Sequence, residues 1–77
     1  PVDLQTREFQ LLELLMLNSG RVVTRAMMLE SVWNFRFDPG TNIVETHMSR
    51  IRSKIDRGGD VPLIHTIRGE GYVIRAD

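Results

Sequence analysis

The feature that most constrains the fold is the segment from Thr41 to Arg57, which has two unlike faces when it is drawn as a helix. At about 100° per residue, its apolar residues fall on one narrow stripe. The stripe consists of Val44, Met48, Ile51 and Ile55. The opposite face consists of Asn42, Thr46, Ser49, Arg50, Ser53 and Arg57. We therefore predict a helix over residues 41–57, capped by Thr41, that packs on a core by one side and presents the other side to a partner.

The outer face of this helix suits the major groove of DNA. Short polar side chains let another surface come close, and the long guanidinium of Arg50 can reach into it. Arg52 and Lys54 lie on the two shoulders of the apolar stripe, where they would contact phosphates on either side. The alternative is an ordinary amphipathic surface helix whose arginines are solvated, and this segment alone leaves both interpretations open.

Composition excludes several other classes of protein. The 77 residues make one small domain and include no cysteine, which excludes disulfides and zinc sites built on thiolates. No apolar run approaches the ~18 residues that span a bilayer, so we expect a cytoplasmic protein without a membrane partner.

The net charge is zero, but residues 41–57 hold four basic side chains against two acidic ones, a surplus of +2. Neither histidine has metal-ligand spacing and no reactive set is visible, so we predict no cofactor, no metal site and no enzyme.

Two further helices are predicted before residue 41. The segment from Thr6 to Leu17 is apolar nearly all round, which is typical of a central helix, and Gly20 would cap its end. Residues 21–23 form a short extended link. Thr24 is a good N-cap for a second helix from Arg25 to Trp33. The inward positions predicted for that second helix are Ala26, Leu29 and Trp33, with Val32 beside them.

The end of the chain predicts a β-hairpin. Residues 63–68 and 72–75 are β-prone, and the segment between them, 69–71, has glycines where a turn wants positive φ. Arg68 stands just before that turn, so it should project from the tip, where arginine suits a narrow minor groove. The alternative is an ordinary turn with an exposed arginine. The order of three helices and a hairpin predicts the α+β class and a winged helix-turn-helix.

A loop from Asn34 to Gly40 joins the second helix to the third. Its seven residues exceed the roughly 3–4 of a tight helix-turn-helix. Phe35 and Phe37 in this loop indicate a partner surface if they are exposed, whereas the alternative is that they fold back under the domain. A winged helix used for protein–protein contact, without specific DNA readout, is accordingly the rival to a DNA-binding function.

The motifs together resemble a known family, the C-terminal effector domain of OmpR/PhoB-type response regulators. The resemblance rests first on TNIVETHMSRIRSKI at 41–55 and TIRGEGY at 66–72. It is supported by LQTREF at 4–9, VTR at 23–25, VW at 32–33 and FDPGTN at 37–42. The likeness covers essentially the whole chain.

The resemblance implies a bacterial two-component transcription factor. A receiver domain, phosphorylated through a sensor histidine kinase, is expected before Pro1, and most of the family's N-terminal four-stranded sheet is missing. The implied partner is double-stranded DNA with repeated half-sites, bound by a domain that is monomeric alone and dimeric on DNA. The helix at 41–57 would enter the major groove, and the wing at 63–75 would touch the minor groove through Arg68.

The resemblance also implies roles for individual residues. Those matching base-facing positions are Ile43, Thr46, Ser49 and Arg50. Those matching phosphate contacts are Trp33, Asn42, His47, Arg52, Thr66, Gly69 and Tyr72, to which the helical plot adds Lys54. Those in the loop that some family members use to contact RNA polymerase are Phe35, Arg36, Phe37 and Asp38.

Overall fold

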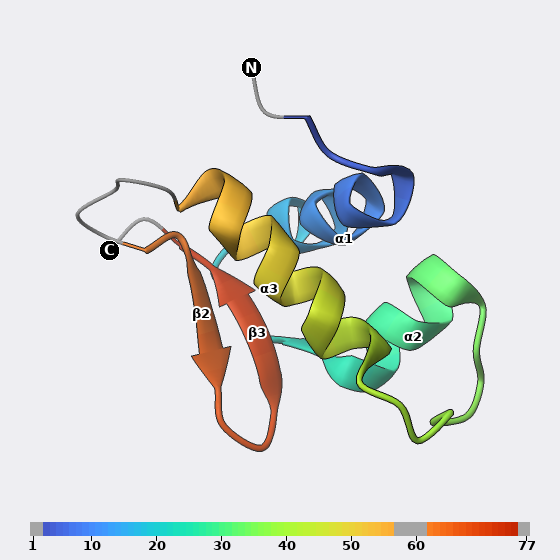
Figure 1. The fold of residues 1–77 in the computed structure, drawn as a ribbon. Coiled ribbons are helices and arrows are strands. Elements are labelled where there is room, and N and C mark those ends of the chain that lie inside the picture. Colours follow the sequence, from blue (N-terminus) through green and yellow to red (C-terminus); the bar gives the residue numbers. More distant parts are fainter. Residues whose placement is uncertain (1–2, 57–61, 76–77) are drawn as a thin grey trace.

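The computed structural model describes residues 3–56 and 62–75. Its elements, in chain order, are α1 (Thr6–Leu17), β1 (Val23–Thr24), α2 (Arg25–Trp33), α3 (Ile43–Ile55), β2 (Ile64–Ile67) and β3 (Gly71–Ile74). Helix α3 lies across α1 and α2, and the hairpin of β2 and β3 extends beside it as a wing (Figure 1). The predicted winged helix is confirmed.

The first two helices begin where local hydrogen bonds favour a helix start. The carboxylate of Glu8 accepts the backbone N–H of Gln5, 3.0 Å away, at the start of α1. At the start of α2, the hydroxyl of Thr24 accepts the backbone N–H of Met27 at 3.1 Å. Such bonds satisfy N–H groups that have no partner inside the helix. The predicted bounds of both helices are confirmed.

The predicted cap at the end of α1 and the predicted cap at the start of α3 are both wrong. Helix α1 is capped by Asn18, whose side chain donates to the carbonyl of Leu14 at 2.9 Å, while Gly20 lies in the turn that follows. Helix α3 begins at Ile43, with Asn42 rather than Thr41 in the capping position and without a side-chain cap bond. Helix α3 ends at Ile55, so it is shorter than predicted, and Arg57 lies outside the described residues.

A single core joins the helices to the sheet. Its buried apolar members are Leu11, Leu15, Val23, Met28, Leu29, Val32, Val44, Met48, Ile51, Ile64 and Val73. The predicted stripe of α3 is therefore confirmed, except that Ile55 is only partly buried. Burial of this stripe on the other elements fixes which face of α3 remains outside.

The predicted inward faces of the first two helices are only partly right. Helix α1 packs against α2, α3 and β3, as expected of a central helix, but its apolar residues Phe9, Met16 and Leu17 are exposed. In α2, Met28 is buried where Ala26 was predicted, and Ala26 is exposed. In both helices apolar residues outnumber the positions that neighbouring elements can cover, so periodicity alone does not select the buried set.

The sheet has three antiparallel strands in the order β1-β3-β2. The segment predicted as an extended link therefore contains a strand, in which Val23 pairs with Tyr72 and Thr24 with Gly71. A Cβ at position 71 would lie 2.1 Å from the carbonyl oxygen of Val23, so the pairing requires glycine there. The wing is thus attached to the body of the domain through β1.

Among residues 3–56 and 62–75, no helix combines the length and the apolar character that crossing a bilayer requires. In the same residues, no three side chains of the histidine, cysteine, aspartate or glutamate types meet in a way that could hold a metal ion.

Candidate nucleic-acid interface

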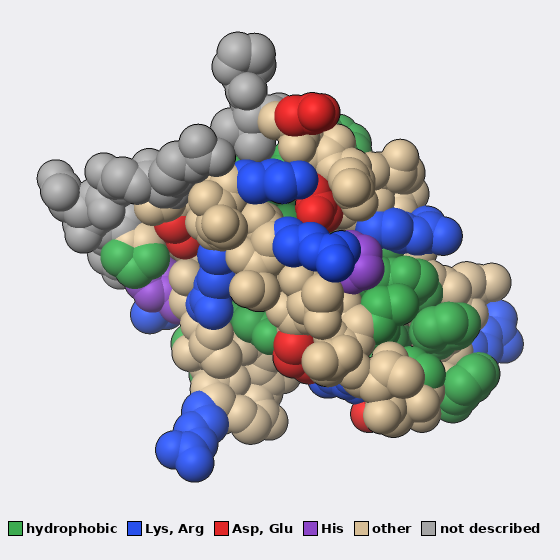
Figure 2. All heavy atoms as spheres, in the orientation of Figure 1, with side chains coloured by type: hydrophobic (Ala, Val, Ile, Leu, Met, Phe, Trp, Pro, Cys, Tyr) green, Lys and Arg blue, Asp and Glu red, His purple; other side chains and the backbone are tan. Residues whose placement is uncertain are grey.

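The outward face of α3 is polar and accessible along its length. Ser49, Arg50 and Ser53 are exposed, and Thr46 and Ile43 are partly exposed. Within the described residues, Arg50 makes no hydrogen bond or ion pair, so its guanidinium is available to a partner. Basic side chains lie over α3 and at the free end of the hairpin (Figure 2). The structure therefore brings the four predicted base-facing residues onto one surface.

Arg52 connects α3 to the wing. Its guanidinium donates to the carbonyl of Ile64 at 3.1 Å and lies over the ring of Tyr72, 5.6 Å from the ring centroid. Burial raises the pKa of the Tyr72 hydroxyl above its usual value. One N–H of the guanidinium serves Ile64, and the remaining N–H groups of a five-donor fork can serve a phosphate. Arg52 can thus hold the wing and contact DNA with one side chain.

Lys54, predicted to contact a phosphate, is partly exposed and is bound to the start of α1. Its ammonium pairs with the Glu8 carboxylate at 2.5 Å and donates to the carbonyl of Asp3 at 3.0 Å. Glu8 is fully buried, and its second carboxylate oxygen has no hydrogen-bond partner in the described part of the chain. The hydrogen bond from Lys54 outweighs burial and holds the pKa of Glu8 below its usual value. This geometry argues against a phosphate contact by Lys54.

Trp33, the last residue of α2, and His47, on α3, form a partly buried pair. Their rings meet edge to face, with centroids 5.1 Å apart and planes at 77°. The Nδ1 of His47 lies 2.8 Å from the carbonyl oxygen of Ile43, a contact that requires a proton on Nδ1. In the neutral ring, Nε2 then has no proton to donate. A phosphate contact through Nε2 of His47 therefore requires the charged imidazolium.

The wing carries its predicted residues at and beside the turn. Thr66, Arg68 and Gly69 are exposed, and the turn is closed by the N–H of Glu70 donating to the carbonyl of Ile67 at 2.9 Å. Gly69 has a φ of 78°, in the left-handed region that favours glycine. Asn42, at the other end of the surface, is exposed just before α3. These residues flank the base-facing set, as phosphate contacts would.

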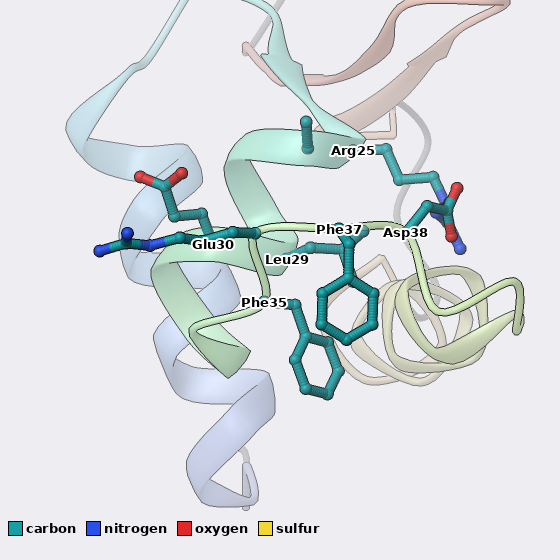
Figure 3. Close-up of a pocket in the computed structure, with 8 residues that line it drawn as sticks. Arg25, Leu29, Glu30, Phe35, Phe37 and Asp38 are labelled. Atoms are coloured by element: carbon teal, nitrogen blue, oxygen red, sulfur yellow. Dashed lines mark ion pairs between the residues drawn. The ribbon is translucent and has the colours of Figure 1, made fainter.

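In the loop between α2 and α3, one phenylalanine folds back on the domain and the other is exposed, so each of the two interpretations holds for one ring. Phe35 packs against the core, whereas 67% of Phe37 is exposed, and their ring centroids lie 5.5 Å apart. Together with α2 they line a groove of about 370 Å³ (Figure 3). The residues lining it are Arg25, Ala26, Leu29, Glu30, Phe35, Arg36, Phe37 and Asp38.

One residue of this region was missed by sequence reasoning. Arg25, the first residue of α2, pairs with Asp38 at 2.8 Å and with Glu45 at 2.8 Å, and donates to the carbonyl of Thr41. The hydrogen bond from Arg25 lowers the pKa of Glu45, and a backbone bond from Gly40 together with Arg25 lowers that of Asp38. No local pattern marks these contacts, because the acids lie 13 and 20 positions along the chain.

Comparisons with known proteins agree with this geometry. Residues 1–74 match the family described as the C-terminal domain of transcriptional regulatory proteins. The probable transcriptional regulatory protein TcrX of Mycobacterium tuberculosis is 48% identical over 75 residues. That match covers 97% of this chain and 32% of TcrX, so the chain spans about a third of the relative's length.

Solved structures give the same picture. The response regulator DrrB of Thermotoga maritima, described as an OmpR/PhoB homologue, is 37% identical with a TM-score of 0.81, and the match covers 97% of this chain and 34% of DrrB. The DNA-binding domain of RstA from Klebsiella pneumoniae, solved in complex with the RstA box, is 28% identical with a TM-score of 0.83. The RstA match covers 95% of this chain and 73% of that one.

Proposed function

The chain belongs to the family of C-terminal domains of transcriptional regulatory proteins, in the winged-helix form of OmpR/PhoB-type response regulators, and on this premise we propose that it binds a specific DNA sequence. Helix α3 enters the major groove and the wing touches the minor groove. The observation that carries the proposal is the exposed polar face of α3 opposite a buried stripe, where Arg50 makes no hydrogen bond or ion pair within residues 3–56 and 62–75. This family is one of DNA-binding regulators and not of enzymes.

The proposed contacts fall into three groups. Ile43, Thr46, Ser49 and Arg50 face the bases. Trp33, Asn42, His47, Arg52, Thr66, Gly69 and Tyr72 contact phosphates. Arg68 approaches the minor groove, whose negative potential favours arginine. Lys54 is left out of the phosphate group because its ammonium is bound to Glu8 and to the carbonyl of Asp3.

The function is tested by titrating the 77-residue chain against random duplex DNA at low and moderate salt, and by selecting bound sequences from a random pool. We expect binding that weakens with salt, because phosphate contacts release counterions, and one enriched sequence. The absolute affinity should be weak, since one domain lacks the avidity of two on repeated half-sites. Binding at neither salt concentration would favour the rival, a winged helix used for protein–protein contact.

Replacing Arg50 with alanine should relax preference at one base position of the selected sequence. A guanidinium bound to two acceptors of guanine contributes about 1–3 kcal/mol of discrimination, so the loss should appear on the matched duplex and not on a scrambled one. Competition binding of both duplexes measures it. Arg21→Ala is the matched control, because Arg21 is an exposed arginine outside α3 and the wing. Equal losses on both duplexes would remove Arg50 from the base-facing group.

The wider setting is part of the proposal. The domain regulates transcription in the bacterial cytoplasm as the effector of a two-component system, with a receiver domain that a sensor histidine kinase acts on. Support comes from the similarity to TcrX, a probable transcriptional regulatory protein, and to the response regulator DrrB. A contact with RNA polymerase is proposed for Phe35, Arg36, Phe37 and Asp38, because Phe37 is exposed at the rim of a groove and Arg36 is exposed beside it. Hydrophobic side chains gather on that side of the molecule (Figure 2).

A further inference from the structure

Arg25 joins three parts of the domain with one guanidinium. It stands at the start of α2 and reaches Asp38 in the loop of residues 34–40, here called the aromatic loop. It also reaches the carbonyl of Thr41 just before α3, and Glu45 in the first turn of α3. In the close-up, the Arg25 and Asp38 side chains point toward each other at one end of the groove (Figure 3). The planar fork of arginine can serve several acceptors at once, which a lysine ammonium does less well.

The first turn of α3 depends on these contacts. Asn42 provides no side-chain cap, so the turn lacks the usual hydrogen bond that holds a helix start. The chain entering α3 is instead held by Arg25, at Thr41 before the turn and at Glu45 within it. Asp38 adds a second constraint, because its carboxylate also accepts the N–H of Gly40 at 2.9 Å. The first turn carries Ile43, one residue before the buried stripe, and leads directly to Thr46.

We propose that Arg25 is a positioning residue that couples the aromatic loop to the DNA-facing start of α3, so that a change in the loop alters sequence discrimination. This inference rests on the proposed DNA-binding function. It extends that function because Asp38, on a loop outside the base-facing set, becomes a determinant of specificity. A partner that binds the loop and draws Asp38 away from Arg25 would change affinity for DNA, and DNA would change affinity for that partner by the same factor.

The Asp38→Asn variant distinguishes an effect of positioning on DNA affinity from an effect of charge alone. Removing a negative charge from a DNA-binding protein by itself strengthens binding to every sequence. Loss of positioning acts in the opposite direction on the selected sequence. We expect the ratio of matched to scrambled affinity to fall about threefold to tenfold. Arg25→Lys, which leaves net charge unchanged, should lower the same ratio, because its ammonium does not reproduce the fork.

Glu30→Gln is the matched control. It removes the same charge from the same groove, but Glu30 points away from Arg25 and Asp38 (Figure 3). The ratio of matched to scrambled affinity should remain unchanged in this variant. A fall equal to that of Asp38→Asn would mean that any acid in the groove has the effect, and would overturn the role of Arg25.

Amide hydrogen exchange of the free chain tests the same coupling without DNA. In Asp38→Asn, we expect faster exchange at the amide of Thr46, which donates to the carbonyl of Asn42 at 2.9 Å, and unchanged exchange at the end of α3. If the unaltered chain binds no DNA, the proposed function fails. Exchange still reports whether the contacts of Arg25 hold the start of α3. If the chain binds DNA but Asp38→Asn keeps its affinity ratio, the inference is overturned whatever the exchange shows. Unchanged exchange at the amide of Thr46 also overturns it.

Discussion

Replacing Lys54 with methionine is expected to lower the free energy of unfolding at pH 7 by about 3 kcal/mol. The substitution leaves the fully buried Glu8 carboxylate without its counter-charge. Breaking a buried ion pair on one side costs about 3–5 kcal/mol, and the lower end applies because Lys54 itself is partly exposed. Methionine keeps most of the side-chain volume, so a lost charge and not a cavity is the cause. Urea unfolding measures the change.

The pH dependence of this variant should be shallower than that of the unaltered chain. In the unaltered chain the pKa of Glu8 is lowered, so its contribution is present above the usual glutamate pKa and is lost as pH falls through the lowered one. Without Lys54 the largest cause of that lowering is gone, so less stability should be lost as pH falls. The double variant Lys54→Met with Glu8→Gln should recover much of the loss at pH 7. A single variant as stable as the unaltered chain would contradict the role of the pair.

Replacing Ile51 with alanine is expected to cost about 2–5 kcal/mol of stability, because Ile51 is fully buried in the middle of the α3 stripe and its removal leaves a cavity. A domain of this size has a stability of only about 4–11 kcal/mol, so the loss is a large share of the total. The melting temperature should fall by on the order of 10–40 °C. Thermal unfolding followed by circular dichroism measures it.

Ile55→Ala is the matched control for Ile51. It removes the same atoms from the same stripe, but Ile55 is only partly buried. It should therefore cost less, since fewer packing contacts are lost and the site is open to solvent. A loss at Ile55 as large as that at Ile51 would show that the stripe does not anchor α3 as the structure has it.

The helices were predictable where their determinants are local. The hydroxyl of Thr24 accepts a hydrogen bond from the backbone N–H three residues ahead, so neighbouring residues determine the start of α2. The stripe of α3 follows from spacing alone, and with it the exposure of Ser49 and Arg50. The family resemblance added the roles of the outward residues, which periodicity does not contain.

The remaining errors have one physical origin, which is that tertiary contacts decide between positions that look equivalent in the sequence. Arg52 and Lys54 occupy similar shoulders of α3, but one shoulder meets the hairpin and the other meets the start of α1. Only the packing of these elements decides which partner each of the two side chains meets. Likewise, Val23 and Thr24 are too short a run to reveal a strand whose partner lies near the far end of the chain.

The pairing of β1 with β3 has a consequence for how the wing meets DNA. Because β3 lies between β1 and β2, the hairpin is already ordered before any ligand arrives. Docking then requires little further loss of backbone conformational entropy in the wing, a cost of about 1–2 kcal/mol for each residue that would otherwise have to be ordered. Thr24 both pairs with Gly71 and caps α2, so a tilt of the wing would pull directly on the helix that begins with Arg25.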